Sequence, residues 1–181
     1  MNIGLFYGST TCYTEMVAEK IQTFINNNVE QCKDFTVEIF NIKDTALSAC
    51  QKYDFIIFGI STWDYGELQE DWESQWSDVA ELNLDAKIVA LYGMGDQVGY
   101  ADWFQDALGM LHDQLTPTGA YMIGHWENVG YAFNESKALT PDKKYFLGLS
   151  LDDETQYELT DTRIEKWINQ LTDDINTLLI S

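Results

Sequence analysis

The chain has 181 residues, 45% of them hydrophobic, which suits one sizeable core and excludes a disordered composition. Its 30 acidic and 10 basic residues give a formal net charge of −20, which argues against nucleic acid and anionic membranes as partners. No apolar run approaches the roughly 20 residues that span a bilayer, and the first residues do not form a signal peptide. We therefore expect one domain over residues 1–181, monomeric and cytoplasmic, with its three cysteines reduced.

Apolar runs alternate with helical patterns along the chain. Strands are expected at 3–7, 35–40, 55–60, 88–92 and 121–123, with a later apolar run at 145–149. Helical periodicity is found at 17–25, 72–79, 104–115 and 164–179. The third and fourth runs are almost continuously apolar, which is typical of strands buried on both faces of a parallel sheet. The alternation indicates right-handed crossovers and a doubly wound α/β fold with helices on both faces.

The loops after the first, third and fourth strands are the candidate functional site, because such sheets bind ligands at the carboxyl ends of their strands. The first loop reads Gly-Ser-Thr-Thr-Cys-Tyr-Thr (8–14). Its hydroxyl groups and the free N–H groups of a helix start suit a phosphate group. No lysine occurs before Lys20, so the loop is not of the nucleoside triphosphate kind and better matches a phosphate monoester. A Ser/Thr-rich helix cap is the alternative.

The second and third loops each contribute an aromatic residue and glycine. They read Ser-Thr-Trp-Asp-Tyr-Gly-Glu (61–67) and Gly-Met-Gly-Asp-Gln-Val-Gly-Tyr (93–100). Glycine permits a tight turn and lets the backbone approach a flat ligand closely. Trp63 and Tyr100 could sandwich a planar ring across the sheet edge. The alternative for Trp63 is partial filling of the core.

Three segments together, 4–16, 61–72 and 90–100, resemble the long-chain flavodoxins, and among them the second flavodoxins of gamma-proteobacteria. The resemblance covers nearly the whole chain. It implies a flavodoxin-like, doubly wound five-stranded parallel sheet of order 2-1-3-4-5 and one non-covalently bound FMN. It also implies that an insertion over about 126–145 splits the fifth strand.

The resemblance also implies which residues contact FMN. The phosphate would be surrounded by Ser9, Thr10, Thr11, Cys12, Tyr13 and Thr14, and the two faces of the ring would be covered by Trp63 and Tyr100. The other cofactor contacts would come from Ser61, Thr62, Asp64, Tyr65, Gly66, Gly93, Gly95, Asp96 and Gly99, with backbone groups at 64–66 and 96–99 facing polar atoms of the ring. Two departures from the family pattern stand out: Cys12 replaces the usual glycine, and Trp103 stands where many relatives carry asparagine.

The function implied by the resemblance is electron transfer rather than enzymatic catalysis. A low-potential one-electron carrier would take electrons from a basic flavoprotein reductase and pass them to redox enzymes, which would dock on an acidic flavin edge. Three alternatives are a flavin-dependent quinone reductase, a phosphoacceptor receiver domain and a binding module without cofactor. The first needs free space over the ring. The second needs an acidic pair directly after the first strand and an aspartate at the end of the third, where the sequence has Gly8-Ser9 and Ile60-Ser61. No metal site is expected, because His112 and His125 have no partners at useful spacing.

Overall fold

The computed structural model describes residues 1–27, 32 and 35–180. The main strands are β1 (Asn2–Tyr7), β2 (Thr36–Asn41), β3 (Phe55–Trp63), β5 (Ile88–Met94), β6 (Tyr121–Ile123) and β9 (Leu149–Leu151), and the short ones are β4 (Glu67–Leu68), β7 (Trp126–Glu127) and β8 (Tyr145–Phe146). The helices are α1 (Tyr13–Asn27), α2 (Glu70–Ser74), α3 (Trp76–Val79), α4 (Asp106–Leu115) and α5 (Thr160–Ile180). Three 3₁₀ turns cover Leu47–Lys52, Thr116–Thr118 and Tyr157–Leu159. The side chain of Leu179, expected in the apolar stripe of α5, lies outside the described part.

The central sheet has the predicted topology. Parallel strands follow the order β2-β1-β3-β5-β6, which is the expected order 2-1-3-4-5 because β4 is only a two-residue strand paired antiparallel to the end of β3. The fifth position consists of two pieces, since β6 pairs with residues 88–90 of β5 and β9 pairs with residues 92–94. The split fifth strand is therefore confirmed.

The segment between the two pieces runs from 124 to 148, slightly wider than the predicted 126–145. The composition of the apolar run at 145–149 predicted a single strand. In the structure this run is divided between two strands, β8 and β9. Its first residues form β8, which pairs antiparallel with β7, and its last residue begins β9 in the main sheet. A turn at Leu147 and Gly148 separates them, and a Cβ at Gly148 would lie 2.4 Å from the carbonyl oxygen of Leu91.

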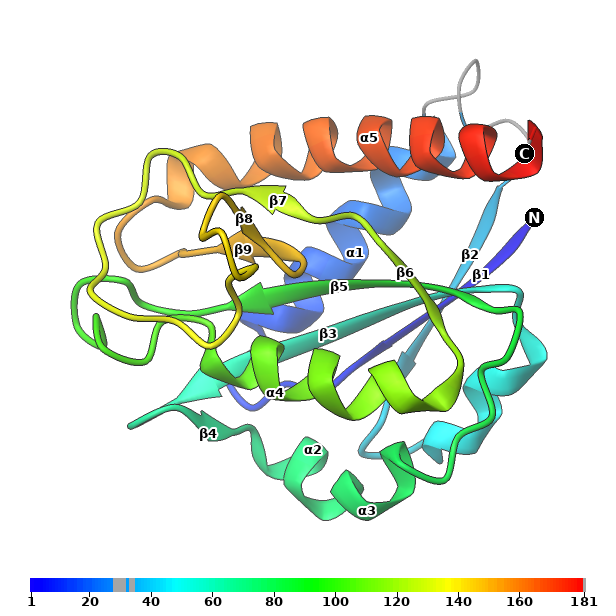
Figure 1. Cartoon of the computed structure of the whole chain (residues 1–181), viewed down its shortest axis with the longest axis horizontal. Coiled ribbons are helices and arrows are strands. Elements are labelled where there is room, and N and C mark those ends of the chain that lie inside the picture. The colour runs from blue at the N-terminus through cyan, green and yellow to red at the C-terminus, as the bar shows by residue number, and fades with distance from the viewer. Residues whose placement is uncertain (28–31, 33–34, 181) are drawn as a thin grey trace.

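The helices cover both faces of the sheet, with α1 and α5 on one side and α2, α3 and α4 on the other (Figure 1). Each face of the sheet has its own hydrophobic core, and alternate strand residues pack into one or the other. Leu5 and Ile57 pack beneath α1 and α5, whereas Phe6 and Phe58 pack towards the opposite helices. Strands buried on both faces read as continuous apolar runs, which explains the sequence pattern. Within the described residues, no helix has the length and apolar character that crossing a membrane requires.

One packing arrangement fixes the end of β1 and the start of α1 relative to the central strands. The hydroxyl of Tyr92 on β5 donates to the backbone oxygen of Thr14 at 2.7 Å. The ring passes directly over Gly59, where a Cβ would lie 2.1 Å from Tyr92 Cζ. Glycine on the intervening strand is therefore what allows Tyr92 to reach α1, and burial raises the pKa of the Tyr92 hydroxyl.

Candidate functional site

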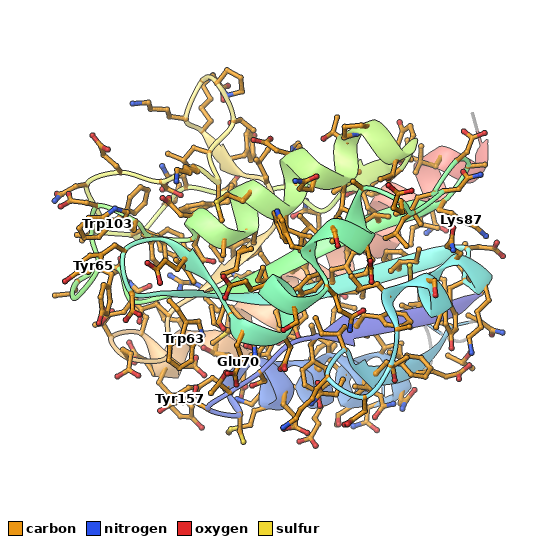
Figure 2. The ribbon with its side chains drawn as sticks, turned by 90° about the horizontal axis from the view of Figure 1, so that it is seen from below. Trp63, Tyr65, Glu70, Lys87, Trp103 and Tyr157 are labelled. Carbon is orange, nitrogen blue, oxygen red and sulfur yellow. The ribbon has the colours of Figure 1, made fainter. Side chains whose placement is uncertain are left out.

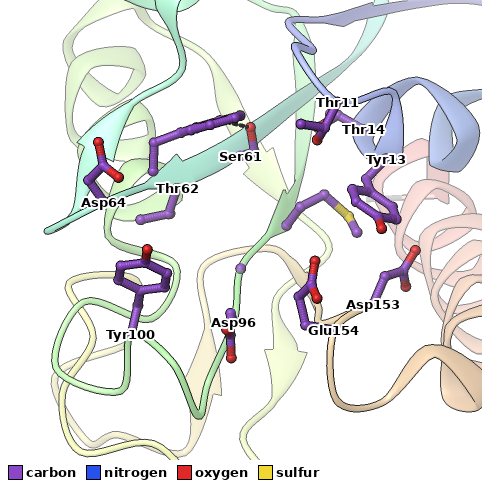
Figure 3. Close-up of a pocket in the computed structure, with 13 residues that line it drawn as sticks. Thr11, Tyr13, Thr14, Ser61, Thr62, Asp64, Asp96, Tyr100, Asp153 and Glu154 are labelled. Carbon is purple, nitrogen blue, oxygen red and sulfur yellow. Dashed lines mark hydrogen bonds between the residues drawn. The ribbon is translucent and has the colours of Figure 1, made fainter.

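A pocket of about 320 Å³ lies at the carboxyl edge of the sheet. It is formed by the loops after β1, β3 and β5, as predicted, together with the loop after β9 (Figure 3). Its size falls within the usual range of about 300–1,000 Å³ for small-molecule sites. Figure 3 shows Thr11, Tyr13 and Thr14 at one side and Asp64 and Tyr100 at the other, with Ser61 and Thr62 between them.

The pocket brings together ten of the predicted site residues: Thr11, Tyr13, Thr14, Ser61, Thr62, Trp63, Asp64, Gly95, Asp96 and Tyr100. Seven others belong to the same loops but do not line it: Ser9, Thr10, Cys12, Tyr65, Gly66, Gly93 and Gly99. The loops were thus correctly located at one edge, whereas the contribution of each residue to ligand contact stays a prediction.

The first loop leads directly into α1. Its last residue, Cys12, adopts the left-handed conformation with φ 68°, and the carbonyl of Cys12 accepts from Met16 N at 2.9 Å. Cys12 stands where the resemblance implies a glycine, and its backbone has a left-handed conformation that glycine adopts without strain. A left-handed φ costs a residue with a Cβ about 1–2 kcal/mol.

The side chains of Gln69, the residue that caps α2, and of Glu70, its first residue, hold the first loop in place. Gln69 Nε2 donates to Thr10 Oγ1 at 3.1 Å, and Thr10 Oγ1 donates to Glu70 Oε1 at 3.4 Å. The Gln69 amide oxygen in turn accepts from the backbone N–H groups of Asp71 and Trp72, which caps α2. The hydroxyl of Thr10 is therefore used within the protein, whereas Thr14 is buried and lines the pocket.

The second loop is a tight hairpin turn between β3 and β4. Gly66 N donates to the carbonyl of Trp63 at 3.1 Å, and both Asp64 (φ 42°) and Gly66 (φ 89°) are left-handed. The prediction that Trp63 lies in the loop was wrong. Trp63 is the last residue of β3, because pairing with Glu67 extends the strand. Its indole Nε1 donates to Ser61 Oγ at 2.9 Å, which fixes the ring over the pocket.

Two further aromatic residues lie beside this turn. Tyr65 is 70% exposed, and its ring meets that of Trp103 edge to face at a centroid distance of 5.1 Å. Figure 2 shows both near Trp63 at the end of the molecule opposite Lys87. Neither Tyr65 nor Trp103 lines the pocket. The pair therefore forms an outer aromatic contact beside the pocket.

The third loop makes most of its backbone hydrogen bonds within the protein. Asp96 Oδ1 accepts from Val98 N at 3.0 Å and from Gly99 N at 2.7 Å, and the Asp96 carbonyl accepts from Tyr100 N at 3.1 Å. Any hydrogen bonds from this loop to a ring in the pocket would therefore have to come from its other backbone groups.

Internal packing accounts for the three glycines of this loop. A Cβ at Gly93 would lie 2.1 Å from Gln105 Oε1, one at Gly95 would lie 3.1 Å from Phe104, and one at Gly99 would lie 2.2 Å from Asp96 Oδ2. Each distance is shorter than ordinary van der Waals contact. The glycines therefore admit neighbouring side chains, and a direct role in approaching a ligand stays a prediction.

Sequence reasoning missed three lining residues, one at the end of β5 and two in the loop after β9. Met94, Asp153 and Glu154 also line the pocket. The rule that selected the other loops would have found the last two, since they follow the second half of the fifth strand at the same edge. They were missed because the apolar run was assigned to 145–149, and the strand in the sheet ends at Leu151.

The pocket is acidic. Its lining includes Asp64, Asp96, Asp153 and Glu154, and none of its lining residues is basic. Burial raises the pKa of Asp153, although Thr160 donates a hydrogen bond to its carboxylate. A bound phosphate would therefore depend on hydroxyl and N–H groups at the start of α1 rather than on cationic side chains. Among the described residues, no group of three or more His, Cys, Asp or Glu side chains could hold a metal ion.

These features define a class: doubly wound α/β proteins with a ligand pocket beside the central strands at their carboxyl edge. The sequence profile described as "Flavodoxin" matches residues 5–167, and the chain belongs to the flavodoxin family. Members of this family are electron-transfer flavoproteins. The expected family and fold are thus confirmed.

Individual relatives agree with this assignment. The chain is 51% identical to "Flavodoxin 2" of Salmonella typhi, over 94% of this chain and 95% of the relative. It is 49% identical to "Flavodoxin 2" of Escherichia coli (strain K12), over 97% of both chains. Among solved structures, a Fusobacterium nucleatum flavodoxin bound to flavin mononucleotide superposes with a TM-score of 0.86 at 25% identity, covering 96% of this chain and 98% of that one.

Proposed function

We propose that this chain binds one FMN non-covalently in the carboxyl-edge pocket. We further propose that it carries single electrons from a flavoprotein reductase to acceptor redox enzymes, acting as one cytoplasmic domain. The observation that carries the proposal is the arrangement of the pocket. A hydroxyl-bearing helix start lies at one end and Tyr100 at the other (Figure 3), and Trp63 also lines the pocket, with its indole bonded to Ser61.

The phosphate end is assigned to the first loop and the first turn of α1. Thr11 and Thr14 line the pocket there, and the positive end of the α1 dipole favours an anion. Thr14 is 1% exposed, so its hydroxyl is shielded from competing water. We assign Ser9, Thr10, Cys12 and Tyr13 to the rim of this phosphate site, where their backbone N–H groups can donate.

The ring end is assigned to the second and third loops. Trp63 is fixed by its hydrogen bond to Ser61, and Tyr100 by its backbone hydrogen bond to Asp96. A flat ring between two aromatic side chains gains stacking energy and loses contact with water. FMN supplies the one-electron chemistry when bound, and the protein supplies its orientation and electrostatic environment.

The acidic surroundings favour a strong reductant. A carboxylate about 10 Å from the ring costs an additional negative charge on the flavin roughly 0.4 kcal/mol in water. That corresponds to on the order of 20 mV for a one-electron couple. Asp96, Asp153 and Glu154 all line the pocket, so several such contributions add.

The same charges suit a basic electron donor. Asp64, Glu67, Glu70 and Glu73 are exposed on the second loop and on α2 beside it. We assign this acidic rim to transient docking of the reductase and of acceptor enzymes. Oppositely charged proteins associate faster than neutral ones at low ionic strength.

An absorption spectrum of the purified protein tests the function. We expect flavin bands at one FMN per chain and a blue, half-reduced form during stepwise reduction. We also expect rapid reoxidation by a one-electron acceptor protein, without consumption of a small-molecule substrate. A colourless protein that fails to take up added FMN would contradict the proposal, and turnover of a quinone would favour the reductase alternative.

A further inference from the structure

A second cavity, of about 510 Å³, lies between α5 and the segment that splits the fifth strand. Figure 1 shows β7 running alongside the first turns of α5, where this cavity is formed. Arg163, Lys166 and Thr162 contribute from α5, and Trp126, Val129 and Tyr145 contribute from the inserted segment. None of its lining residues lines the carboxyl-edge pocket, so the two cavities are separate.

The unusual group in this cavity is the guanidinium of Arg163. The residue is only 7% exposed, and among the described residues its Nη1 has no hydrogen-bond partner and its guanidinium no ion-pair partner. The guanidinium lies over the ring of Tyr131, whose centroid is 4.3 Å from Arg163 Cζ. A buried charged side chain is normally paired, because burial without a partner costs several kcal/mol.

The position of Arg163 in α5 increases this cost. The residue lies in the first turn of a 21-residue helix, where the helix dipole places partial positive charge. A cation there is disfavoured, and an anion is favoured. An anion in the cavity would therefore offset both the missing ion pair and the unfavourable dipole.

We propose that this cavity binds a small organic oxyanion, an apolar body that carries a carboxylate or phosphate group. Arg163 and Lys166 recognise the oxyanion, and Trp126, Val129 and Tyr145 contact the apolar body. The site lies outside the proposed flavin pocket and does not depend on the function proposed for that pocket.

The apolar wall explains why a bare ion is not the ligand. Val129 is 72% exposed and Tyr145 is 40% exposed, which places large apolar side chains at the surface around a cationic centre. Trp126 Nε1 donates to the hydroxyl of Tyr131 at 2.8 Å, and this bond fixes the wall against the aromatic partner of Arg163. A cavity of this volume fits a small organic molecule.

The other charged and titratable groups of the cavity determine whether its electrostatic potential favours an anion. Glu127 lines the cavity and is exposed, so its carboxylate opposes an anion. Burial lowers the pKa of His125, which is consequently neutral near pH 7 and adds no positive charge. The segment 126–145 carries three lysines and three acidic residues, so it is electrically neutral in a chain of net charge −20. An anion therefore approaches this cavity past a neutral segment.

The test is an NMR titration of the full chain with excess FMN added, followed at the indole N–H of Trp126, and it can be run whether or not the chain takes up the FMN. Benzoate and phenyl phosphate serve as organic oxyanions, benzamide as the uncharged analogue of benzoate, and inorganic phosphate as the anion without an apolar body. We expect saturable shifts with the two organic oxyanions and none with benzamide. The tighter binding of benzoate or of phenyl phosphate identifies the preferred head group, carboxylate or phosphate. Inorganic phosphate should bind at least about tenfold more weakly than phenyl phosphate.

Charge variants then assign the recognition. Arg163→Met should weaken benzoate binding at least about tenfold, as expected for a hydrogen bond to a charged group. Lys166→Met should weaken it less, and Glu127→Gln should strengthen it. Lys43→Met removes an exposed lysine outside this cavity and serves as the matched control without effect. If Arg163→Met does not fold, the opposite effects of Lys166→Met and Glu127→Gln still decide the question.

Several outcomes would overturn the proposal. Equal binding of benzamide and benzoate would show an apolar groove without anion recognition, and equal binding of inorganic and phenyl phosphate would show an ion site only. Absence of any saturable shift, or charge variants that match the Lys43 control, would also overturn it. Visible flavin absorption reports the other pocket separately, so a colourless protein would contradict the proposed function without affecting this titration.

Discussion

The buried carboxylate of Asp152 accepts two hydrogen bonds from Gln97, one from its backbone N at 3.1 Å and one from Nε2 at 2.9 Å. Gln97 Oε1 also accepts from Ala132 N, at 2.6 Å. One glutamine thus joins the third pocket loop to the end of β9 and to the inserted segment. Both Gln97 and Asp152 are almost fully buried. We infer that this pair holds the loop in position for the ring.

Gln97→Leu should weaken binding of FMN and riboflavin equally, by about tenfold to a hundredfold, because the bonds it removes reach a buried charged group. Equal loss is expected because we assign the third loop to the ring end of the pocket, and FMN and riboflavin have the same ring. Titration with both flavins measures this effect. Gln156→Leu is the matched control, because Gln156 Nε2 also donates to the inserted segment, at the carbonyl of Gly130, but does not belong to the third loop. A larger loss for FMN than for riboflavin would contradict this role.

Thr14→Ala should weaken FMN binding by about 1.5–3 kcal/mol, the range for a hydrogen bond to a charged group. Riboflavin lacks the phosphate and should be affected much less. Thr23→Ala replaces an exposed threonine on the same helix and should change neither affinity. Equal losses for the two flavins would show that Thr14 does not contact the phosphate.

Bound flavin should be almost non-fluorescent, because Trp63 and Tyr100 would contact its two faces. Replacing either by alanine should restore part of the emission and loosen the flavin. Fluorescence titration of each variant measures both effects. Tyr121→Ala, at an exposed tyrosine outside the pocket, is the control. If both variants remain dark and bind tightly, Tyr65 and Trp103 become the candidates for the stacked rings.

The acidic rim should control docking rather than flavin retention. Glu67→Gln/Glu73→Gln should reduce the salt dependence of electron transfer from a basic reductase and leave FMN affinity within about tenfold. Glu70 is left unchanged because Thr10 of the first loop donates to it. Asp71 is left unchanged because Gln69 Nε2 donates to it at 2.7 Å. At 0.1 M salt the Debye length is about 10 Å, so long-range attraction is largely screened by then.

Stopped-flow reduction across a salt series measures this dependence. The control is Glu81→Gln/Asp85→Asn, in the segment leading to Lys87, which Figure 2 places at the end of the molecule opposite Tyr65. Both double variants remove the same amount of charge. Identical salt slopes for the two would show that the rim is an ordinary solvated surface.

Cys12→Gly should raise the free energy of unfolding by about 1 kcal/mol, because glycine adopts a left-handed φ without the steric cost of a Cβ. Cys12→Ala keeps the Cβ and should give no such gain. Urea unfolding at saturating FMN, with both variants side by side, measures the difference. Equal stability of the two variants would show that the loop relaxes without cost.

The sequence by itself determined the fold class and the location of the site. Periodicity is a local property, and a parallel sheet brings the carboxyl ends of its strands to one edge, so the loops at 8–14, 61–67 and 93–100 could be placed together without coordinates. The chemical character of these loops, with hydroxyl groups in the first and aromatic rings in the other two, was also readable from the sequence.

Tertiary structure alone decided which residues meet across long sequence separations. The bonds between Gln97 and Asp152, and the contact of Arg163 with Tyr131, depend on how β9 and α5 pack against the inserted segment. Pairing with Glu67 extended β3 through Trp63, although the apolar run that predicted this strand ended at residue 60. Such contacts arise from the packing of whole elements, and a pattern within one segment carries no information about its neighbour in space.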